Sequence, residues 1–371
     1  MSAIRVLVVD DSVVVRKVLC DILSSEPSIE VVGTAASGNI ALAKIPQLTP
    51  DVMTLDIEMP GLNGLETLAQ VRKLYPKISV IMCSTLTERG ASVTLEALSS
   101  GASDYVTKPT NSEGLTSAQE QMRSELIPKI LSLRNRLARP TFSAHSVVHR
   151  RLEPCRVEIL AIGTSTGGPN ALGEVIPRIP ENFPVPIVIV QHMPPVFTRL
   201  LAERLNSQSP LSVREAEPGA EVKAGTVWIA RGDYHMMVRR RNRAVVLELN
   251  QDMPENSCRP AVDPLFRSVA ATYGSHTLAV VMTGMGADGT RGAKDVRDAG
   301  GSVLIQDEAS SVVWGMPGSV AGAGLADEIH PLREISSAIV QRVRFGRAMP
   351  AGMRSSGTWN QQSGETGHRV S

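Results

Sequence analysis

Aromatic residues and cysteines are scarce in this chain of 371 residues. Aromatic residues make up 3% of the sequence, a composition that favours aliphatic cores of the α/β kind. The four cysteines are far apart and include no Cys-x-x-Cys pair: Cys20, Cys83, Cys155 and Cys258. This spacing offers no zinc site and fits a reducing compartment, so we expect a cytoplasmic protein.

Segments and charges typical of membrane or nucleic-acid-binding proteins are also missing. No apolar run approaches the roughly 20 residues that span a bilayer, and residues 1–5 lead into a strand without a signal-like segment. The formal net charge is only +1, so we expect no membrane insertion and no nucleic acid partner. A basic cluster between two strand-like runs is predicted to be a solvated hairpin turn, with a docking patch for an acidic partner as the alternative. The cluster consists of Arg239, Arg240, Arg241 and Arg243.

What the chain does contain is the composition of a globular protein and a repeated α/β rhythm. Hydrophobic residues make up 42% and charged residues 20%, and the length suits roughly two or three domains. Short apolar strands separated by helical segments predict a parallel, doubly wound sheet. The predicted strands are 5–9, 31–35, 52–55, 79–83 and 104–106 in the first part, and 158–162, 187–190, 226–230, 277–283 and 302–305 in the second.

Breaks in this rhythm predict the domain boundaries. Residues 1–123 form one α/β domain and residues 154–345 form another. Residues 124–153 continue a polar helix that starts near 119 and then lose all periodicity, which is typical of an interdomain linker. Residues 346–371 are polar and rich in Ser, Gly and Gln, and are predicted to be a disordered tail.

Three carboxylates follow two of the predicted strands in the first domain: Asp10, Asp11 and Asp56. The carboxyl ends of parallel strands meet at one edge of a sheet, where ligands bind. Clustered carboxylates repel one another unless a cation lies between them, and Mg²⁺ is the cation expected with oxygen ligands. Lys108 and Ser84 follow two further strands and bring an ammonium group and a hydroxyl to the same edge.

These residues resemble the receiver domain of two-component response regulators, a (βα)5 fold with a parallel, doubly wound sheet. The match covers residues 4–123. In chain order, its motifs are Asp10-Asp11, Asp56 with Met59-Pro60-Gly61, Ser84, and Lys108-Pro109.

The resemblance implies a role for each of these residues. Asp56 accepts a phosphoryl group from a histidine kinase, and Lys108 contacts that group. The resemblance assigns Mg²⁺ to Asp10, Asp11 and Asp56 together with the Glu58 carbonyl. Ser84 and Tyr105 report phosphorylation to the surface of the domain.

In the second domain, the segment 163–168 follows an apolar strand and reads Gly-Thr-Ser-Thr-Gly-Gly. A strand that breaks into Gly-x-Ser-x-Gly can lift a serine hydroxyl onto a sharp strand-to-helix turn, so Ser165 is a candidate nucleophile. Such a serine needs a base and a group that orients the base. Among the seven histidines, His192 directly follows a predicted strand and therefore shares the sheet edge with Ser165. Asp288, in the glycine-rich loop after the strand 277–283, is the candidate orienting acid.

The loop that holds Asp288 also supports another interpretation. Its glycines, Gly284-x-Gly286-x-x-Gly289, match the dinucleotide-binding fingerprint, and Asp307 ends the next strand near the expected spacing. An aspartate inside the fingerprint would repel a pyrophosphate, and the fingerprint normally opens the first βα unit of its domain. These two features argue against a nucleotide site but leave it as an alternative to a hydrolase. The other alternative is a response regulator with a non-enzymatic output such as DNA binding.

The chain order Ser165, His192, Asp288 differs from that of ordinary α/β-hydrolases. It resembles instead the chemotaxis-type protein-glutamate methylesterase/protein-glutamine glutaminase family, in which a receiver is joined to a three-layer α/β esterase domain with a mostly parallel sheet. The matching motifs are residues 163–169 (GTSTGGP), 191–194 (QHMP), 263–266 (DPLF) and 282–289 (MTGMGADG).

This second resemblance implies an activity. Ser165, His192 and Asp288 hydrolyse glutamate methyl esters on chemoreceptors and deamidate receptor glutamines, and the esterase needs no cofactor. The N–H groups of Thr166 and Met285 stabilise the oxyanion. Because a receiver precedes an esterase in one chain, we further expect the unphosphorylated receiver to cover the Ser165 edge and phosphorylation of Asp56 to open it.

Overall fold

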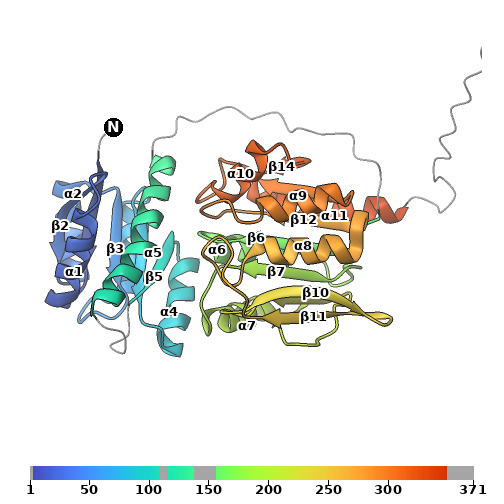
Figure 1. Ribbon diagram of the computed structural model, residues 1–371. Coiled ribbons are helices and arrows are strands. Elements are labelled where there is room, and N and C mark those ends of the chain that lie inside the picture. The colour runs from blue at the N-terminus through green and yellow to red at the C-terminus, as the bar shows by residue number, and fades with distance from the viewer. Residues whose placement is uncertain (1–2, 109–114, 138–155, 349–371) are drawn as a thin grey trace, which may run out of the picture.

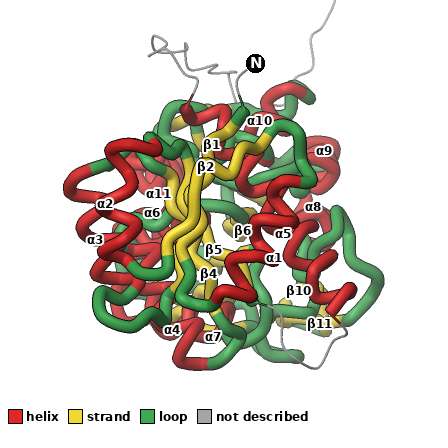
Figure 2. Tube along the Cα trace, turned by 90° about the vertical axis from the view of Figure 1, so that its left-hand side faces the viewer, coloured by secondary structure: helices red, strands yellow, loops and turns green. Residues whose placement is uncertain are grey.

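The computed structural model describes residues 3–108, 115–137 and 156–348, which form two α/β units packed side by side (Figure 1). The N-terminal unit contains a five-stranded sheet of order β2-β1-β3-β4-β5, and every strand pair in it is parallel. Its strands are β1 (Ile4–Val9), β2 (Ile29–Ala35), β3 (Val52–Asp56), β4 (Ser79–Ser84) and β5 (Asp104–Thr107). Its helices are α1 (Val13–Ser24), α2 (Gly38–Leu48), α3 (Gly64–Leu74), α4 (Glu88–Ser99) and α5 (Leu115–Leu137). The predicted doubly wound sheet is confirmed. Figure 2 views this sheet edge-on, with its strands one behind another.

The C-terminal unit contains a seven-stranded sheet of order β14-β13-β12-β6-β7-β9-β8, again with parallel pairs. Its strands are β6 (Ile159–Thr164), β7 (Ile187–Gln191), β8 (Ser212–Glu215), β9 (Thr226–Ile229), β12 (Thr277–Val281), β13 (Ser302–Gln306) and β14 (Glu328–His330). Its helices are α6 (Gly168–Val175), α7 (Phe197–Gln208), α8 (Val262–Tyr273), α9 (Thr290–Asp298), α10 (Met316–Gly322) and α11 (Leu332–Ala348), with short 3₁₀ turns at Ile176–Arg178 and Gly274–His276. The sequence missed β8 and β14, because both are short and only partly buried.

Alternation along the strands explains why this unit has three layers. Leu160 and Ile162 of β6 face a core shared with α6, α7 and α11. Ile159 and Ala161, one residue out of phase, face the core under α8, α9 and α10. Successive side chains of a strand point to opposite faces, so a sheet that is apolar at every position is covered by helices on both sides.

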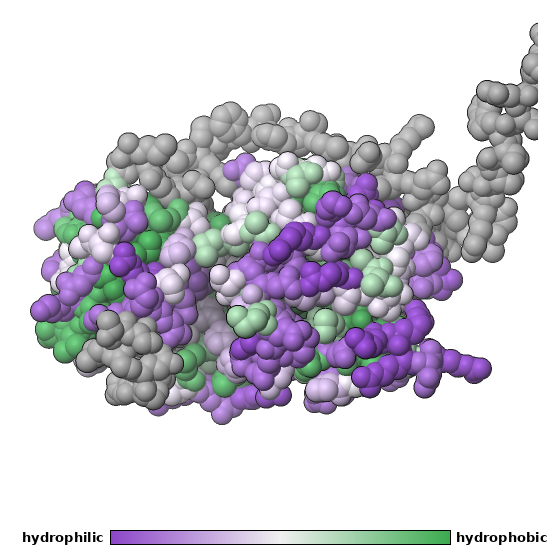
Figure 3. All heavy atoms as spheres, viewed as in Figure 1, coloured by the Kyte–Doolittle hydropathy of each residue, from purple (hydrophilic) through white to green (hydrophobic). Residues whose placement is uncertain are grey.

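The basic cluster lies on the separate antiparallel hairpin of β10 (His235–Arg241) and β11 (Ala244–Asn250). Residues 239–243 are exposed at its turn, as predicted. Hydrophilic side chains gather along this hairpin in the space-filling view (Figure 3).

Side chains cap most helices of the N-terminal unit. Ser12, Ser37 and Thr87 each accept a hydrogen bond from a backbone N–H in the first turn of the helix that follows. At α3, Asn63 and Glu66 form a reciprocal capping box. Such a cap typically stabilises a helix by about 1 kcal/mol.

Helix α5 requires a correction to the predicted boundary. Residues 124–133 were assigned to the linker, but Leu126, Ile130 and Leu133 are fully buried against β1 and α1. The apolar face of α5 completes the N-terminal core, so the boundary predicted at residue 123 lies inside a packed helix. Residues 138–153 of the linker and 349–371 of the tail lie outside the described residues, and α11 extends to Ala348, three residues into the predicted tail.

The two units contact each other through α4 and β5 on one side and α6 and α7 on the other. The ring of Tyr105 stacks on that of Phe197, with centroids 4.8 Å apart and planes 8° from parallel. The guanidinium of Arg204 donates to the carbonyl of Leu95, and the Asn170 amide donates to the carbonyl of Leu98 at 2.7 Å. Two side chains of the C-terminal unit therefore hold the last turn of α4.

A second part of the contact lies beside the loop after β12. Val313 belongs to the apolar cluster that β1, α1 and α5 form, and Met285 packs against that cluster. The N-terminal unit therefore reaches the glycine-rich loop that holds Asp288.

Candidate functional site

Ser165 lies on the turn that joins β6 to α6. Its backbone N–H donates to the Thr283 carbonyl at 3.0 Å, and its own carbonyl accepts from Gly168 N at 2.8 Å. Gly167 has a φ of +77°, in the left-handed region that side chains disfavour. A Cβ on Gly284 would lie 2.9 Å from the Cβ of Ser165, so the glycine in the facing loop leaves room for the serine. The predicted strand-to-helix turn is present, and Ser165 is half-buried on it.

His192 is placed by strand register. Thr164 pairs with Gln191 across the parallel strands β6 and β7, so Ser165 and His192 are the next residues on neighbouring strands. A backbone hydrogen bond of 3.2 Å from His192 N to the Thr164 carbonyl continues the ladder to this point. The side chain of Gln191 also donates to the Ser165 carbonyl at 3.0 Å, which fixes the two strand ends together.

Asp288 reaches the same edge and is 2% exposed. Its Oδ2 lies 2.8 Å from His192 Nε2 and accepts from Val262 N at 2.6 Å. Its Oδ1 accepts from the Asn256 amide at 2.7 Å, from Asp263 N at 3.1 Å and from its neighbour Gly289 N at 2.9 Å. Burial opposes the charged form, but His192 and these donors outweigh burial and lower the pKa of Asp288. The carboxylate is therefore held charged in one orientation.

One ring nitrogen of His192 contacts Asp288, and the other can exchange a proton with the serine. Nε2 faces Asp288, and Nδ1 lies 3.5 Å from the Cys258 thiol. Within the described residues, no hydrogen bond joins Ser165 to this ring. Nucleophile–base contacts are often loose before substrate binds, and Nδ1 is the nitrogen available to the serine. Burial works against the imidazolium, but the contacts with Asp288 and with Cys258 together outweigh burial and raise the pKa of His192, which makes the ring a stronger base.

Two backbone donors lie free beside the serine. Among the described residues, the N–H groups of Thr166 and Met285 donate to no protein acceptor. The Thr283 hydroxyl donates to the Thr166 carbonyl at 2.9 Å, which holds the serine turn against the loop of Met285. Paired N–H groups of this kind can stabilise a negative oxygen that develops next to the serine.

The other candidate histidines of this unit have different surroundings. The ring nitrogens of His235 contact Met253 O and Ala261 N, whereas His330 pairs with Glu328. His276 lies before β12, at the opposite edge of the sheet, and contacts the Arg156 carbonyl. None of these three contacts Ser165 or Asp288 within the described part of the chain.

Sequence reasoning did not assign roles to several residues of this site: Gln191, Asn256, Cys258 and Asp263. Gln191 and Asp263 fall within motifs that carry the family resemblance, so the signal for them was present. Asn256 and Cys258 lie in the loop before α8, where neither spacing nor periodicity marks them.

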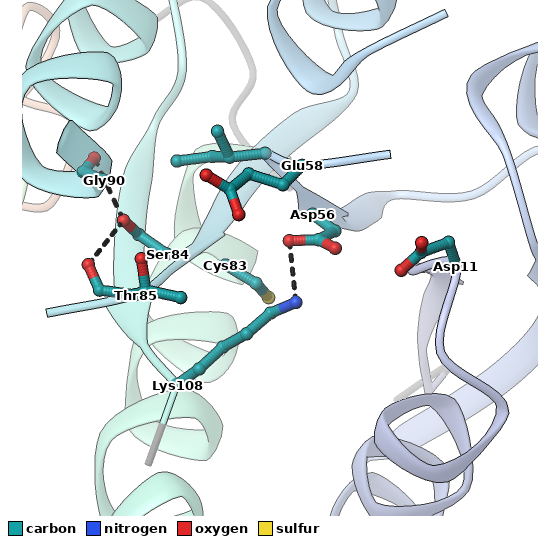
Figure 4. A pocket seen from close by; sticks show the side chains of 9 residues that line it. Asp11, Asp56, Glu58, Cys83, Ser84, Thr85, Gly90 and Lys108 are labelled. Atoms are coloured by element: carbon teal, nitrogen blue, oxygen red, sulfur yellow. Dashed lines mark hydrogen bonds and ion pairs between the residues drawn. The ribbon is translucent and has the colours of Figure 1, made fainter. Parts of the chain in front are cut away.

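The N-terminal unit has a pocket at the carboxyl edge of its own sheet (Figure 4). Lys108 Nζ lies 2.8 Å from Asp10 Oδ2 and 2.7 Å from Asp56 Oδ1. Figure 4 shows Asp11, Glu58 and Lys108 around Asp56. Burial raises the pKa of the Asp56 carboxyl, and Lys108 only partly opposes it. Burial also disfavours the Lys108 ammonium, but its two carboxylate partners raise its pKa overall.

The donors in this pocket suit a hard divalent cation. Oxygen atoms of Asp10, Asp11 and Asp56 all lie within 4.8 Å of one another. Mg²⁺ prefers such carboxylate oxygens together with carbonyl oxygens and water. One lysine for three carboxylates leaves the cluster short of positive charge, which a bound cation would supply.

Of the two predicted switch residues, Ser84 lines the pocket and Tyr105 lies at the contact with the C-terminal unit. The Ser84 hydroxyl donates to the Gly90 carbonyl at 3.1 Å and accepts from the Thr94 hydroxyl at 2.6 Å, so it is bonded to α4. Tyr105 is buried at the contact between the two units, against Phe197. The pocket is thus linked to the face that touches the C-terminal unit.

Comparisons with known proteins match both parts of the chain. The family model described as CheB methylesterase matches residues 160–339, and the one described as response regulator receiver domain matches residues 6–120. The chain is 51% identical over 351 residues to a protein-glutamate methylesterase/protein-glutamine glutaminase of Trichodesmium erythraeum, covering 92% of this chain and all of that one. It is 47% identical to the protein of the same name from Thermotoga maritima, covering 92% and 98% of the two chains. The crystal structure of the Thermotoga maritima CheB methylesterase catalytic domain is 48% identical and covers 50% of this chain and 98% of its own, with a TM-score of 0.49.

Proposed function

The chain belongs to the protein-glutamate methylesterase/protein-glutamine glutaminase family, and from this premise we propose that it removes methyl groups from glutamate esters of chemoreceptors. The proposal includes deamidation of receptor glutamines and activation by phosphorylation of the N-terminal receiver. The observation that carries it is the meeting of Ser165, His192 and Asp288 at one sheet edge, with the His192–Asp288 contact at 2.8 Å.

In the proposed mechanism, Ser165 Oγ attacks the ester carbonyl carbon while His192 Nδ1 takes the hydroxyl proton. Asp288 holds the ring through Nε2 and stabilises the imidazolium that forms. The carbonyl oxygen becomes an oxyanion, which accepts hydrogen bonds from Thr166 N and Met285 N. His192 returns the proton to the departing methoxy oxygen, and methanol leaves.

A water molecule completes the cycle. His192 removes a proton from the water, whose oxygen attacks the acyl-serine carbonyl. As this second intermediate collapses, the bond from the carbonyl carbon to Ser165 Oγ breaks, His192 returns the proton to Oγ, and glutamate is released. Glutamine differs from the methyl ester only in its leaving group, which is ammonia instead of methanol. The same residues therefore serve the glutaminase activity, and this part of the cycle uses no group beyond the chain and water.

In the receiver, we assign phosphoryl transfer to Asp56, with a histidine kinase as the donor. Bound Mg²⁺ would neutralise charge on the transferring group, held by Asp10, Asp11 and Asp56 with the Glu58 carbonyl. Lys108, which already bridges Asp10 and Asp56, would then contact the phosphoryl oxygens. The Ser84 hydroxyl would then turn toward the phosphoryl group in the pocket and weaken its hydrogen bonds with Gly90 and Thr94 of α4.

The contacts between the units support control by obstruction. A receptor helix must reach Ser165, and the receiver packs on α6 and α7, the helices that directly follow the strands of Ser165 and His192. Loss of those contacts after phosphorylation would expose the sheet edge that holds Ser165 to a receptor helix. Such a switch requires a differential affinity of only a few kcal/mol between two packings, on the order of 5 kcal/mol for nearly complete conversion.

The test is mass spectrometry of receptor glutamate and glutamine side chains after incubation with the full chain, with and without a phosphodonor. We expect loss of methyl groups that increases with phosphodonor and is absent with a folded Ser165→Ala variant. Unchanged receptor side chains with phosphorylated wild-type protein would overturn the proposal.

A further inference from the structure

Beyond the triad, we propose that Asn256 and Asp263 are positioning residues, which hold Asp288 so that its Oδ2 stays aimed at His192. This inference rests on the proposed function, because the triad is the machinery that they would position. Within the described residues, neither residue forms a hydrogen bond with Ser165 or His192, and both donate to Asp288.

Asn256 bridges two buried carboxylates through one amide nitrogen. Its Nδ2 donates to Asp288 Oδ1 at 2.7 Å and to Asp263 Oδ2 at 2.9 Å, and its Oδ1 accepts from Arg291 at 3.2 Å. A neutral donor shared by two acids offsets part of the repulsion between them: burial and Asp288 together still raise the pKa of Asp263, and the Asn256 amide opposes this rise. Of the donors to Asp288 Oδ1, only Asn256 is a side chain; the other two are the backbone N–H groups of Asp263 and Gly289.

Asp263 anchors this bridge in the protein core. Its side chain is fully buried in the first turn of α8. Its Oδ1 accepts from Gly292 N at 2.7 Å, in the first turn of α9, and its Oδ2 accepts from the Asn256 amide and from Arg291 Nε at 3.3 Å. The carboxylate thus ties α8 to α9, the helix that begins two residues after Asp288.

The backbone at Asn256 forms a tight turn that presents its side chain to the two carboxylates. Asn256 has a φ of 52° and Ser257 a φ of 61°, both in the left-handed region, which asparagine adopts more readily than most residues other than glycine. The Cys258 N–H closes the turn by donating to the Glu255 carbonyl at 2.9 Å. The turn therefore sets the position from which the Asn256 amide reaches Asp288 and Asp263.

The result is a chain of contacts that runs from the core to the base: Asp263, Asn256, Asp288, His192. Among the described residues, Arg291 contacts Asp263 and Asn256, and the Cys258 thiol contacts His192. Charge changes in the chain should therefore reach the imidazole. An extra carboxylate at position 256 raises the pKa of His192, and loss of the carboxylate at 263 lowers it.

The test uses the full-length protein and two measurements. The first is the kinetics of receptor demethylation as a function of pH. The second is the NMR titration of His192 in protein carrying isotope-labelled histidine, which needs no substrate. The variants are Asn256→Ala, Asn256→Asp and Asp263→Asn. The matched control is Asn242→Ala, since Asn242 also has a positive φ, of 55°, but lies at the exposed turn of the β10–β11 hairpin.

We expect Asn256→Ala to lower kcat about tenfold with KM nearly unchanged, while the control keeps wild-type kinetics. The pKa of His192 from NMR, and the pH at which kcat/KM is half-maximal, should rise in Asn256→Asp and fall in Asp263→Asn. If Asn256→Ala does not fold, the test rests on Asp263→Asn. This variant keeps the shape of the side chain but can place an amide NH2 group opposite the NH2 group of Asn256, so that the hydrogen bond between residues 256 and 263 is lost.

Folded variants with wild-type kcat, or with an unshifted His192 titration, would overturn the inference even if their thermal stability fell. An inactive wild-type protein with shifted titrations in both charge variants would contradict the proposed function alone. The two failures are therefore distinguishable.

Discussion

Asp56 and Asp288 are both buried aspartates at the carboxyl edge of a parallel sheet, yet their surroundings are opposite. Asp56 has one cationic partner, Lys108, beside a pocket, and burial raises its pKa. Asp288 accepts five hydrogen bonds from neighbours on all sides, which lower its pKa despite burial. The carboxyl edge of a parallel sheet therefore holds a carboxylate with few partners in one unit and one with many partners in the other.

The difference matches the two chemistries. An aspartate that forms a bond to a phosphoryl group must keep an oxygen free and face an open pocket. An aspartate that orients a histidine must not move, and every lone pair bound to a donor restricts it. Parallel sheets collect functional groups at one edge, but the hydrogen-bond partners decide whether a carboxylate reacts or supports.

The strongest way to break this comparison is Asp288→Asn. We expect kcat to fall on the order of 10³-fold or more, because the amide cannot hold the ring and stabilise the imidazolium as a carboxylate does. Activity requires the neutral imidazole, and Asp288 raises the pKa of His192. The residual kcat/KM should therefore reach half its maximum at a lower pH than in the wild type. Steady-state kinetics over pH 5–10 (roughly 1.5 units below to 3.5 above the ordinary histidine pKa) measures both, and wild-type activity in a folded variant would refute the assignment.

Asp56→Asn should leave the basal activity intact and remove only its stimulation. The amide cannot accept a phosphoryl group, so the expected loss equals the activation ratio, about 5- to 150-fold for a coupling of about 1–3 kcal/mol. The measurement is demethylation before and after addition of a small phosphodonor with Mg²⁺. Asp51→Asn is a suitable control, since Asp51 lies at the opposite end of β3 and accepts from Arg5 N at 2.9 Å. Stimulation that persists in Asp56→Asn would show that the acceptor lies elsewhere.

Tyr105→Leu tests how the two regions communicate. Leucine keeps apolar volume on β5 but removes the ring that stacks on Phe197. Aromatic pairs contribute about 0.5–1.5 kcal/mol beyond their buried area, so unphosphorylated activity should rise roughly two- to tenfold. Tyr75→Leu, a tyrosine at the end of α3, is the matched control and should change nothing. Equal activity of Tyr105→Leu and wild type would mean that this contact does not restrain the enzyme.

The smallest expected effect is on stability, and its sign differs between the two aspartates. The pKa of Asp56 is raised in the fold, so its charge destabilises the receiver at neutral pH and the penalty is relieved as the pH falls through its folded pKa. The pKa of Asp288 is lowered, so its charge stabilises the fold above the unfolded pKa, near 3.9, and this contribution is lost as the pH falls through its folded pKa. Calorimetry at pH 7 (a value roughly 3 units above the unfolded pKa) should find the Tm of Asp56→Asn raised and that of Asp288→Asn lowered by a few degrees. Shifts of the same sign would erase the contrast.

The sequence predicted most of what depends on strand ends and little of what depends on loops. Ser165 and His192 directly follow apolar strands of one sheet, and Asp56 ends an apolar strand of the other, so a local pattern was enough to place each at the carboxyl edge of its own sheet. The sequence predicted a helix near the end of the first domain but placed residues 124–137 of α5 in the linker, because this segment is polar at first, whereas its burial comes from contacts with β1 and α1, far away in the chain.

The support of Asp288 was beyond local patterns for the same reason. Asn256 is 32 residues from Asp288 in the chain and meets it only because the loop before α8 folds back over the sheet edge. The contact between Tyr105 and Phe197 joins residues from separate domains, and nothing near either residue in the sequence predicts the pair. Tertiary contacts of this kind have no signature in spacing or periodicity.

Labelling with a serine-reactive phosphonate tests the central claim most directly, because it reports the one activated hydroxyl at the C-terminal edge. The full-length protein is treated with phosphodonor and Mg²⁺, incubated with the reagent, and digested for peptide mapping by mass spectrometry. The account predicts a single adduct on Ser165, formed faster after phosphorylation and about as slowly as background in Asp288→Asn. An active protein that carries no adduct on Ser165, or carries it on another residue, would contradict the triad.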